Sequence, residues 1–327
     1  MNDRQYDVTA IGNAIVDVLA QSDDKFLEEQ RLPKGAMSLI DSDHAEYLYG
    51  LMGPGVERSG GSAANTAAGI AGLGGKVAYI GKVADDQLGE VYAHDIRAVG
   101  VTFRTPPLKD GLPTARSLIF VTPDAQRTMQ TFLGACTAFG PDDVDEDLIA
   151  NSKVLFMEGY LWDDPKAIEG MRKAARIATA AGVKVAFTTS DPFCVDRHRE
   201  EFLDLSENHI DILFANEAEI LSLFQVDDFD KALQRIRGMC EIAALTRSEK
   251  GSVVATASEV HVIDAEKVEV VDTTGAGDAY AAGFLFGYTQ GKPLDVCGRL
   301  GGMLASEAIS HYGARAEADL KQMAARV

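Results

Sequence analysis

The segment from Val270 to Tyr288, VVDTTGAGDAYAAGFLFGY, carries the clearest chemical pattern in the chain. Its first residues predict a strand, and the small residues after Asp278 predict a helix. Between them, Gly275, Ala276 and Gly277 let the chain turn sharply and point several N–H groups in one direction. The start of a helix adds positive potential at that turn. We therefore predict an anion hole for a phosphoryl group, with the Asp278 carboxylate at its rim as the base for an attacking hydroxyl.

Two familiar phosphate-binding loops do not fit this segment. A Walker A loop needs Gly-Lys followed by Ser or Thr, and no Gly-Lys pair of the chain is followed by either. Tyr280 stands where a Rossmann fingerprint has its last glycine. As a bare glycine turn the segment would also be typical of an ordinary helix start, but the full string Asp-Thr-Thr-Gly-Ala-Gly-Asp is far more specific.

The elements that must position this turn alternate along the second half of the chain. Apolar runs predict strands near 154–158, 183–189, 210–216 and 242–246, with an amphipathic helix over 166–182. This alternation indicates an α/β fold with a mainly parallel central sheet flanked by helices. The first half adds strands without helices of their own, which predict a small β-sheet lid. The predicted division is a main α/β part of residues 1–12, 41–100 and 136–327, and a lid of residues 13–40 and 101–135.

Composition excludes several classes of partner. Of 327 residues, 50 are acidic and 31 basic, so the formal net charge is −19. Nucleic acids and anionic membranes both require a basic face, so we expect neither as a partner. The polar start lacks the apolar region of a secretory signal, and no apolar run reaches the length of a membrane span. The four scattered cysteines form no CxxC pair, so we expect a cytoplasmic protein with reduced thiols.

Two segments together resemble the signatures of the ribokinase-like (PfkB) carbohydrate kinases. DTTGAGDAYAAGF is similar to the family's C-terminal signature, and SGGSAANTAAGIAGLGGKVAYIGKVADDQLG, from Ser59 to Gly89, is similar to its N-terminal one. They stand in the same order at opposite ends, so the resemblance covers nearly the whole chain. It implies a ribokinase-like fold with a small lid, ATP as the phosphoryl donor, and Mg²⁺.

The resemblance also implies roles for residues that bind the nucleotide. Asp278 matches the family's catalytic base. Asn216 and Glu219 match its Asn-x-x-Glu motif, which helps to place Mg²⁺ and the ATP phosphates, with Glu219 acting through water. Taken alone, this pair would equally be typical of a helix cap. Thr246 matches a phosphate contact, but Ser248 departs from the glycine of many relatives.

The substrate pocket follows from the same resemblance. Asp17 matches the family acid that holds two adjacent hydroxyls, and Asn13, Gly60, Gly61 and Asn65 match the residues that complete the pocket. A carboxylate that accepts two hydroxyl hydrogens suits the vicinal diol of a sugar ring. Ribokinases and adenosine kinases share this arrangement, so it does not choose between their substrates.

Three features resemble the adenosine kinase branch. The stretch between Asp17 and Gly60 is long, the segment 113–135 is similar to that branch's lid, and Tyr160 stands where the branch stacks an aromatic ring on adenine. The predicted base slot, which would also be typical of core packing, consists of Met37, Leu39, Met129, Thr131, Leu133 and Tyr160. We therefore predict 5′-phosphorylation of adenosine or of purine nucleosides more broadly, by a monomer or homodimer.

Weaker expectations and alternatives accompany this prediction. Arg127, on the lid, is expected to move onto the phosphates. Asp272, Thr274 and the region of Gly313 are expected to form a monovalent-cation (K⁺) site through main-chain oxygens. The alternatives are a sugar kinase of the same family for ribose, fructose or a related sugar, and a nucleoside-binding protein without activity. A third alternative is a metal-dependent hydrolase that would use Asp196 and His198 with Glu200.

Overall fold

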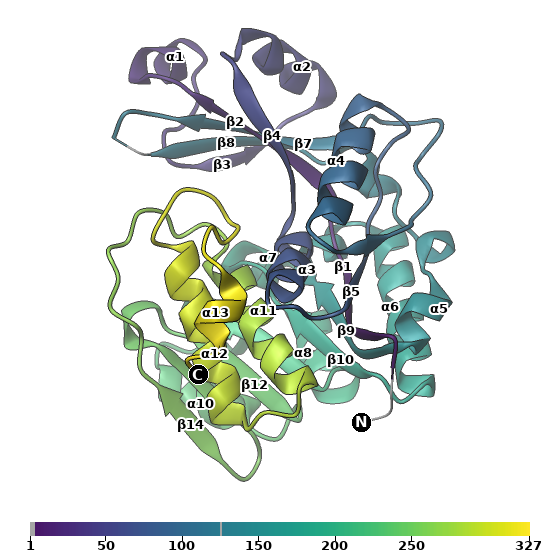
Figure 1. Ribbon diagram of the computed structural model, residues 1–327, viewed down its shortest axis with the longest axis vertical. Helices are drawn as coiled ribbons and strands as arrows, with labels where there is room; N and C mark the ends of the chain where they lie inside the picture. Colours follow the sequence, from purple (N-terminus) through teal and green to yellow (C-terminus); the bar gives the residue numbers. More distant parts are fainter. Residues whose placement is uncertain (1–3, 125) are drawn as a thin grey trace.

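The computed structural model describes residues 4–124 and 126–327. Residues 1–3 of the predicted main part and Ala125 of the predicted lid turn lie outside the described residues. Two sheets organise the chain: a nine-stranded sheet with helices on both faces, and a five-stranded sheet across one end of it (Figure 1). The predicted α/β fold, with a large central sheet and a second small sheet, is confirmed.

The large sheet has the order β14-β13-β12-β11-β10-β9-β1-β5-β6. Pairing is parallel from β6 through β12 and antiparallel only for β13 and β14 at one edge. Its strands are β1 (Tyr6–Ile11), β5 (Val77–Ile80), β6 (Thr102–Phe103), β9 (Ser152–Glu158), β10 (Lys184–Thr188), β11 (Ile212–Asn216), β12 (Ile242–Thr246), β13 (Ser252–Ala255) and β14 (Val260–Ile263).

Helices cover both faces of the large sheet, because its central strands are apolar on both sides. In β9, Val154 and Phe156 join the core beneath α3 and α11, whereas Leu155 and Met157 join the core beneath α6. The α-helices are α1 (Asp24–Glu29), α2 (Ser42–Leu51), α3 (Ser62–Gly72), α4 (Gln87–Ala98), α5 (Glu146–Ala150), α6 (Pro165–Ala180), α7 (Pro192–Arg197), α8 (Arg199–Asn208), α9 (Glu217–Phe224), α10 (Phe229–Ile236), α11 (Ala276–Thr289), α12 (Leu294–Ala308) and α13 (Leu320–Ala324). Short 3-10 turns are η1 (Gly134–Ala138), η2 (Pro141–Asp143), η3 (Gly159–Asp163) and η4 (Ser248–Lys250).

Many of the acidic residues serve to start these helices. An Asp carboxylate accepts first-turn N–H groups at the start of α1, α2, α4, α5, α6, α7, α10 and α13. Helices α3 and α11 differ, since each begins at a glycine with positive φ, Gly61 or Gly275, and has no side-chain cap from that residue. Both of these starts point to the same place, the carboxyl end of the large sheet.

The small sheet has the order β3-β8-β7-β2-β4, and its two faces differ. On one face, Val16 and Val18 are buried with Phe120 among the side chains of α1 and α2. On the other face, Asp17 and its neighbours point toward the large sheet. The strands are β2 (Ile15–Gln21), β3 (Met37–Leu39), β4 (Gly55–Gly60), β7 (Ala115–Val121) and β8 (Arg127–Phe132).

The membership of the two sheets differs from the predicted division at two strands. β4 pairs antiparallel with β2 in the small sheet, although residues 41–100 were predicted to be in the main part. β6 pairs with β5 in the large sheet, although residues 101–135 were predicted to be in the lid. The reason is that β4, GVERSG, has no apolar alternation, and its place is fixed only by pairing with a strand about 40 residues away.

The surface and thiols add two observations. Among the described residues, no helix has the length and apolar character needed to span a membrane.

All four cysteines are buried and unpaired, at Cys136, Cys194, Cys240 and Cys297, as expected for thiols that form neither a disulfide nor a CxxC metal site.

Candidate active site

The turn before α11 is shaped by a glycine that no other residue can replace without strain. Gly275 has φ of 75°, and a Cβ there would lie 2.6 Å from the Cβ of Ala314. No side chain caps the start of α11, although the N–H of Ala276 donates to the carbonyl oxygen of Thr273 at 3.3 Å, and Gly277 is exposed. The predicted anion hole residues therefore lie at an open helix start with the positive end of the helix dipole.

The Asp278 carboxylate lies in the first turn of α11 and faces α3. Ser62 Oγ donates to Asp278 Oδ1 at 2.6 Å, and Asn65 Nδ2 donates to Asp278 Oδ2 at 3.1 Å. Burial raises the pKa of Asp278, and these two hydrogen bonds oppose the rise. The two hydrogen bonds hold this carboxylate in place beside the predicted anion hole residues.

Asp17 reaches the same end of the large sheet from the small sheet. Burial raises the pKa of Asp17 to about 6, against the opposing charges of Arg315 and Arg127, and the charge of Asp278 raises it further. A Cβ on Gly60 would collide with the Asp17 carboxylate, so the glycine permits this approach. The two predicted carboxylates, one for substrate hydroxyls and one for the base, are thus electrostatically coupled across the gap between the sheets.

The Gly-Gly pair turns the chain from β4 into α3. Gly61 has φ of 95°, and a Cβ there would collide with the carbonyl oxygen of Asn13. This close packing sets Asn13 beside the pair and brings Asn65, one turn into α3, opposite Asp278. The predicted pocket residues of the N-terminal segments therefore converge, although they come from β2, β4 and α3.

Glu158 is a buried acid of this site that the sequence did not single out. It ends β9, is 1% exposed, and accepts hydrogen bonds from Asn13 N at 2.7 Å and Ala63 N at 2.8 Å. Burial raises its pKa to about 7, against those two bonds. Glu158 thereby caps α3 from outside and ties α3 to the loop after β1. A charged residue at the end of an otherwise apolar strand was the available signal.

Asn216 and Glu219 form a capping box at the start of α9. Glu219 N donates to Asn216 Oδ1 at 2.9 Å, and Asn216 N donates to Glu219 Oε2 at 2.9 Å. Thr189 Oγ1 also donates to that oxygen at 2.6 Å, and burial raises the pKa of Glu219. Asn216 and Glu219 therefore cap a helix, as the alternative interpretation predicted, and the cap holds the buried Glu219 carboxylate at the carboxyl end of β11.

The donor set fits Mg²⁺ that arrives with a nucleotide. Glu219 already accepts several hydrogen bonds, which favours contact with the ion through water, the way Mg²⁺ commonly meets protein carboxylates. Thr246 is the register partner of Asn216 on β12, so both lie at the same sheet edge. Ser248, which replaces the glycine of many relatives, adopts φ of 51°, the conformation that a glycine would favour.

The inner face of the small sheet carries most of the predicted base slot. Strand register places Leu39 beside Thr131, Thr131 beside Ser117, and Ser117 beside Asp17. The next row holds Met37 beside Met129. Met37 and Leu39 are 49% and 61% exposed, so their apolar surface is open on this face.

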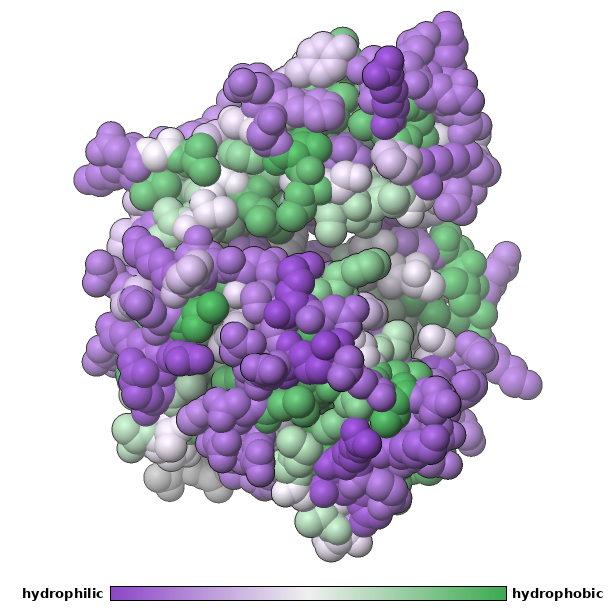
Figure 2. All heavy atoms as spheres, turned by 180° about the vertical axis from the view of Figure 1, so that it is seen from behind, coloured by the Kyte–Doolittle hydropathy of each residue, from purple (hydrophilic) through white to green (hydrophobic). Residues whose placement is uncertain are grey.

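The surface between the two sheets is hollowed, and apolar side chains gather on the small-sheet side of it (Figure 2). Leu133, just beyond β8, is half-buried at the large-sheet end of this face. Tyr160, in η3, is partly buried on the opposite side, where its hydroxyl lies 3.4 Å from Ser190 O. Burial raises the pKa of Tyr160, and the charges of Asp191, Asp278 and Glu158 raise it further.

Arg127 joins the small sheet to the loop before α11. Its Nη1 lies 2.7 Å from Asp272 Oδ2, and both side chains are more than 90% buried. Asp272 also accepts hydrogen bonds from Thr274 N, Thr274 Oγ1 and Gly313 N. These donors occupy the carboxylate, so a K⁺ site here would depend on main-chain oxygens alone. Arg127 Nε and Nη2 are buried without a partner among the described residues.

The remaining candidates contribute nothing to this site. Asp196 accepts a hydrogen bond from Ser222 and pairs with Arg199, and His198 pairs with Asp163. No three His, Cys, Asp or Glu side chains of residues 4–124 and 126–327 gather as a metal site.

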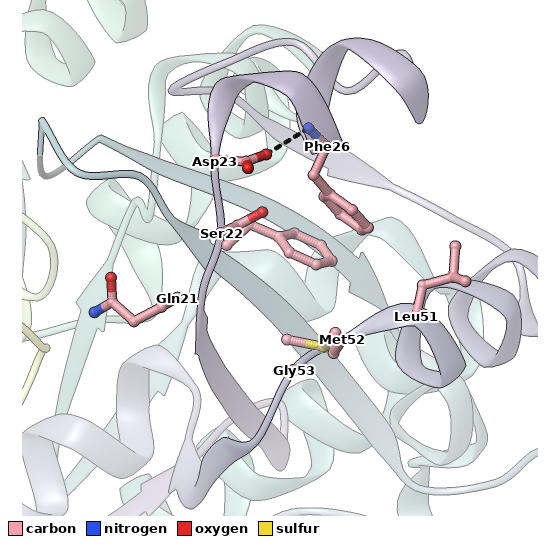
Figure 3. A pocket seen from close by; sticks show the side chains of 8 residues that line it. Gln21, Ser22, Asp23, Phe26, Leu51, Met52 and Gly53 are labelled. Atoms are coloured by element: carbon pink, nitrogen blue, oxygen red, sulfur yellow. Dashed lines mark hydrogen bonds between the residues drawn. The ribbon is translucent and has the colours of Figure 1, made fainter.

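A separate hollow of about 390 Å³ lies between α1 and the end of α2 (Figure 3). There Asp23 accepts a hydrogen bond from Phe26 N at 2.8 Å, as a helix cap, and the other lining is largely apolar.

Comparisons with known proteins identify the family of the chain. A family model described as pfkB family carbohydrate kinase matches residues 40–321. The crystal structure of adenosine kinase from Sinorhizobium meliloti is similar at 56% identity, over 98% of this chain and 99% of that one, with a TM-score of 0.91. A probable sugar kinase from Rhizobium etli CFN 42 is similar at 52% identity, over 99% of this chain and 98% of that one, also with a TM-score of 0.91. A curated ATP-dependent ribose-1-phosphate kinase from Halopiger xanaduensis is 32% identical over 70% of this chain and 73% of its own length.

Proposed function

The chain belongs to the pfkB family of carbohydrate kinases and is a phosphotransferase with an alcohol group as acceptor; on that premise we propose that it transfers the γ-phosphoryl group of ATP to the 5′-hydroxyl of adenosine. The observation that carries the proposal is the 56% identity to the Sinorhizobium adenosine kinase along the whole chain. The apolar inner face of the small sheet supports it further, because a base needs an apolar slot and a free sugar does not.

The substrate is held from two sides in this proposal. Asp17 accepts hydrogen bonds from the two ring hydroxyls of ribose, and Asn65 stands beside the sugar. Tyr160 stacks on the base, and the apolar face that includes Leu39 and Met129 covers it when the small sheet closes. Such positioning converts a two-molecule encounter into a reaction within one complex, which is a large share of phosphoryl-transfer catalysis.

The transfer step uses the start of α11. The Asp278 carboxylate accepts the proton of the 5′-hydroxyl as that oxygen bonds to the γ-phosphorus, and the bond to the bridging oxygen of ADP breaks. The N–H groups of Gly275, Ala276 and Gly277 stabilise the charge on the transferring group. The buried Arg127, with two nitrogens, Nε and Nη2, free of partners among the described residues, is proposed to contact the phosphates.

ATP brings Mg²⁺ with its phosphates. The bound ion neutralises phosphate charge, and Glu219, through water, and Asn216 are the residues proposed to orient it. Thr246 is proposed to contact a nucleotide phosphate.

The proposal is tested by the identity of the product. With Mg-ATP and adenosine, we expect ADP and AMP in equal amounts, with the new phosphate on the 5′-oxygen by ³¹P NMR. The matched substrate 5′-deoxyadenosine, which lacks only the acceptor oxygen, should give no phosphorylated nucleoside and should inhibit competitively. ADP release without AMP would refute the proposal.

A sugar kinase is the second candidate. Two of the relatives favour it, namely the probable sugar kinase from Rhizobium and the ribose-1-phosphate kinase from Halopiger. The roles proposed for Asp17 and Asp278 are the same in both cases, so the two candidates differ only in whether the apolar face binds a base.

A further inference from the structure

Arg315 joins three elements of the candidate active site from a late part of the chain. It lies between α12 and α13, in the segment that rises toward the small sheet in Figure 1. Its Nη2 donates to Ser59 Oγ at 2.7 Å, and its Nη1 donates to Asp95 Oδ2 at 3.2 Å. Its Nε donates to Asn65 Oδ1 at 3.4 Å. The side chain of Arg315 is 17% exposed and that of Asp95 is 34% exposed.

The contact with Asn65 determines how this amide faces the base. A guanidinium only donates hydrogen bonds, so the amide oxygen turns toward Arg315 and the amide NH₂ turns away from it. That NH₂ donates to Asp278 Oδ2 at 3.1 Å. A continuous chain of hydrogen bonds therefore runs from Arg315 through Asn65 to Asp278, and each bond strengthens the next by polarisation.

The contact of Arg315 with Ser59 lies next to Gly60, which packs against the Asp17 carboxylate. Ser59 directly precedes Gly60, whose missing side chain makes room for Asp17. Asp95, from α4, accepts a hydrogen bond from Ser59 N at 2.9 Å and so closes a ring of contacts with Arg315. Arg315 is also the strongest charge that opposes the effect of burial on the Asp17 carboxyl. Arg315 therefore contacts a neighbour of each carboxylate, since Asn65 donates to Asp278 and Ser59 precedes Gly60.

We propose that Arg315 is a positioning residue for phosphoryl transfer, which orients the base through Asn65 and holds the link between β4 and α3 through Ser59. The proposal rests on the proposed function for the roles of Asp278 and Asp17. It is independent of which alcohol is the acceptor. A purely structural arginine, which only fastened the C-terminal segment, would affect stability but not the turnover of the folded enzyme.

A cavity beside Arg315 makes a direct test practical. It has a volume of about 440 Å³, and Asn65, Ala279, Arg315 itself and Lys321 are among the residues that line it. In Arg315→Ala the cavity would extend to the vacated guanidinium position. Free guanidinium ion is a planar cation with the lost group's hydrogen-bond geometry, and urea is a neutral molecule of almost the same shape.

The experiment measures kcat and KM with Mg-ATP, using whichever of adenosine and ribose the wild-type protein phosphorylates. We expect Arg315→Ala to lower kcat by at least about tenfold, and millimolar guanidinium chloride to recover at least about half of that loss, whereas urea recovers none. Lys321→Ala, which removes another cation from the same cavity without touching Asn65, should keep wild-type kcat in all three solutions. Asn65→Ala and Arg315→Ala together should cost less than the product of their separate effects, because they break one chain of bonds.

Several results would overturn the proposal. Wild-type kcat in Arg315→Ala would do so, as would a loss that guanidinium does not restore in a variant with wild-type Tm. If Arg315→Ala does not fold, Arg315→Lys retains the charge but loses the fork of donors. A wild-type kcat in that variant would then contradict the proposal, and a reduced kcat at unchanged Tm would support it. Phosphorylation of ribose but not adenosine would refute the proposed substrate. The kcat values of the Arg315 variants and the wild type could still be compared with ribose as the acceptor.

Discussion

The carboxyl end of the large sheet and the inner face of the small sheet border the same hollow but are built differently. At the large sheet, the groups proposed to take part in phosphoryl transfer are backbone N–H groups and carboxylates. Unusual local conformations, such as the turn at Gly275 with φ of 75°, hold them in place. At the small sheet, the groups proposed to bind the substrate are side chains that strand register places next to one another, such as Leu39 beside Thr131. The first kind is local in sequence and the second is not. The chemistry of the site is therefore more tightly determined than the choice of substrate.

The largest expected effect is at the base. Asp278→Asn removes the proton acceptor while it keeps two hydrogen-bonding atoms, so kcat should fall by about 10²–10⁴ while ATP still binds. Turnover in an ADP-release assay and ATP affinity by calorimetry check both parts. Asp295→Asn, on the exposed side of α12, is the control. Near wild-type turnover of Asp278→Asn would show that Asp278 is not the catalytic base.

The anion hole should be nearly as sensitive. Gly275→Ala places a Cβ against Ala314 in a left-handed conformation, which displaces the first-turn N–H groups, so we expect kcat to fall by about 10²-fold. Gly302→Ala in α12, where a Cβ meets nothing within 4 Å, should keep kcat and raise Tm slightly. Equal kcat in the two variants would show that the backbone turn is not essential.

The pH profile links the two regions, because Asp17 belongs to one and Glu158 to the other. Burial raises their pKa values to about 6 and about 7; Asp17 is proposed to accept the substrate hydroxyls as an ionised carboxylate, and Glu158 accepts hydrogen bonds from Asn13 N and Ala63 N. One unit below the pKa only about a tenth of Asp17 is ionised, so kcat/KM at pH 5 should be at least about tenfold lower than at pH 8.

The free energy of unfolding should change with pH in the opposite direction to kcat/KM, so it should fall as the pH rises from 5 to 8. The folded state binds these two protons more tightly than the unfolded chain does, so their contribution to stability is complete at low pH and is lost as the pH rises through about 6–7. Protonation of Asp17 and Glu158 therefore does not unfold the protein, and a Tm series run beside the activity profile separates the two effects. A kcat/KM that stays flat to pH 5 would contradict the ionised role of Asp17.

The smallest effect concerns substrate choice. Tyr160→Ala should raise KM for adenosine by about tenfold, since stacking of one base on an aromatic ring contributes about 1–3 kcal/mol, and should barely alter KM for ribose. Tyr160→Phe keeps the ring and should resemble the wild type, and Tyr47→Ala, on the exposed side of α2, controls for the loss of a tyrosine elsewhere. Equal shifts for adenosine and ribose would assign Tyr160 to packing.

The same contrast explains what the sequence could predict. The strands β9 to β12, the turn at Gly275 and the pair Asn216 and Glu219 are contiguous patterns; the strands form as expected, and Asn216 lies beside Thr246 at the carboxyl ends of β11 and β12. The membership of β4 in the small sheet, and the contacts of Glu158 with Asn13 and Ala63, join residues 35 to 145 positions apart. No local pattern encodes such partners. Arg315 was missed for the same reason, since its three acceptors lie more than 200 positions away.

The most direct measurement compares acceptors in one ADP-release assay with Mg-ATP: adenosine, inosine, guanosine, cytidine, ribose and fructose. The account predicts the highest kcat/KM for adenosine by a wide margin, because only a purine base uses both Tyr160 and the apolar face around Leu39. A higher kcat/KM for ribose or fructose would contradict it. The fold and the chemistry at Asp278 would then stand, and the apolar face would be packing surface rather than a base slot.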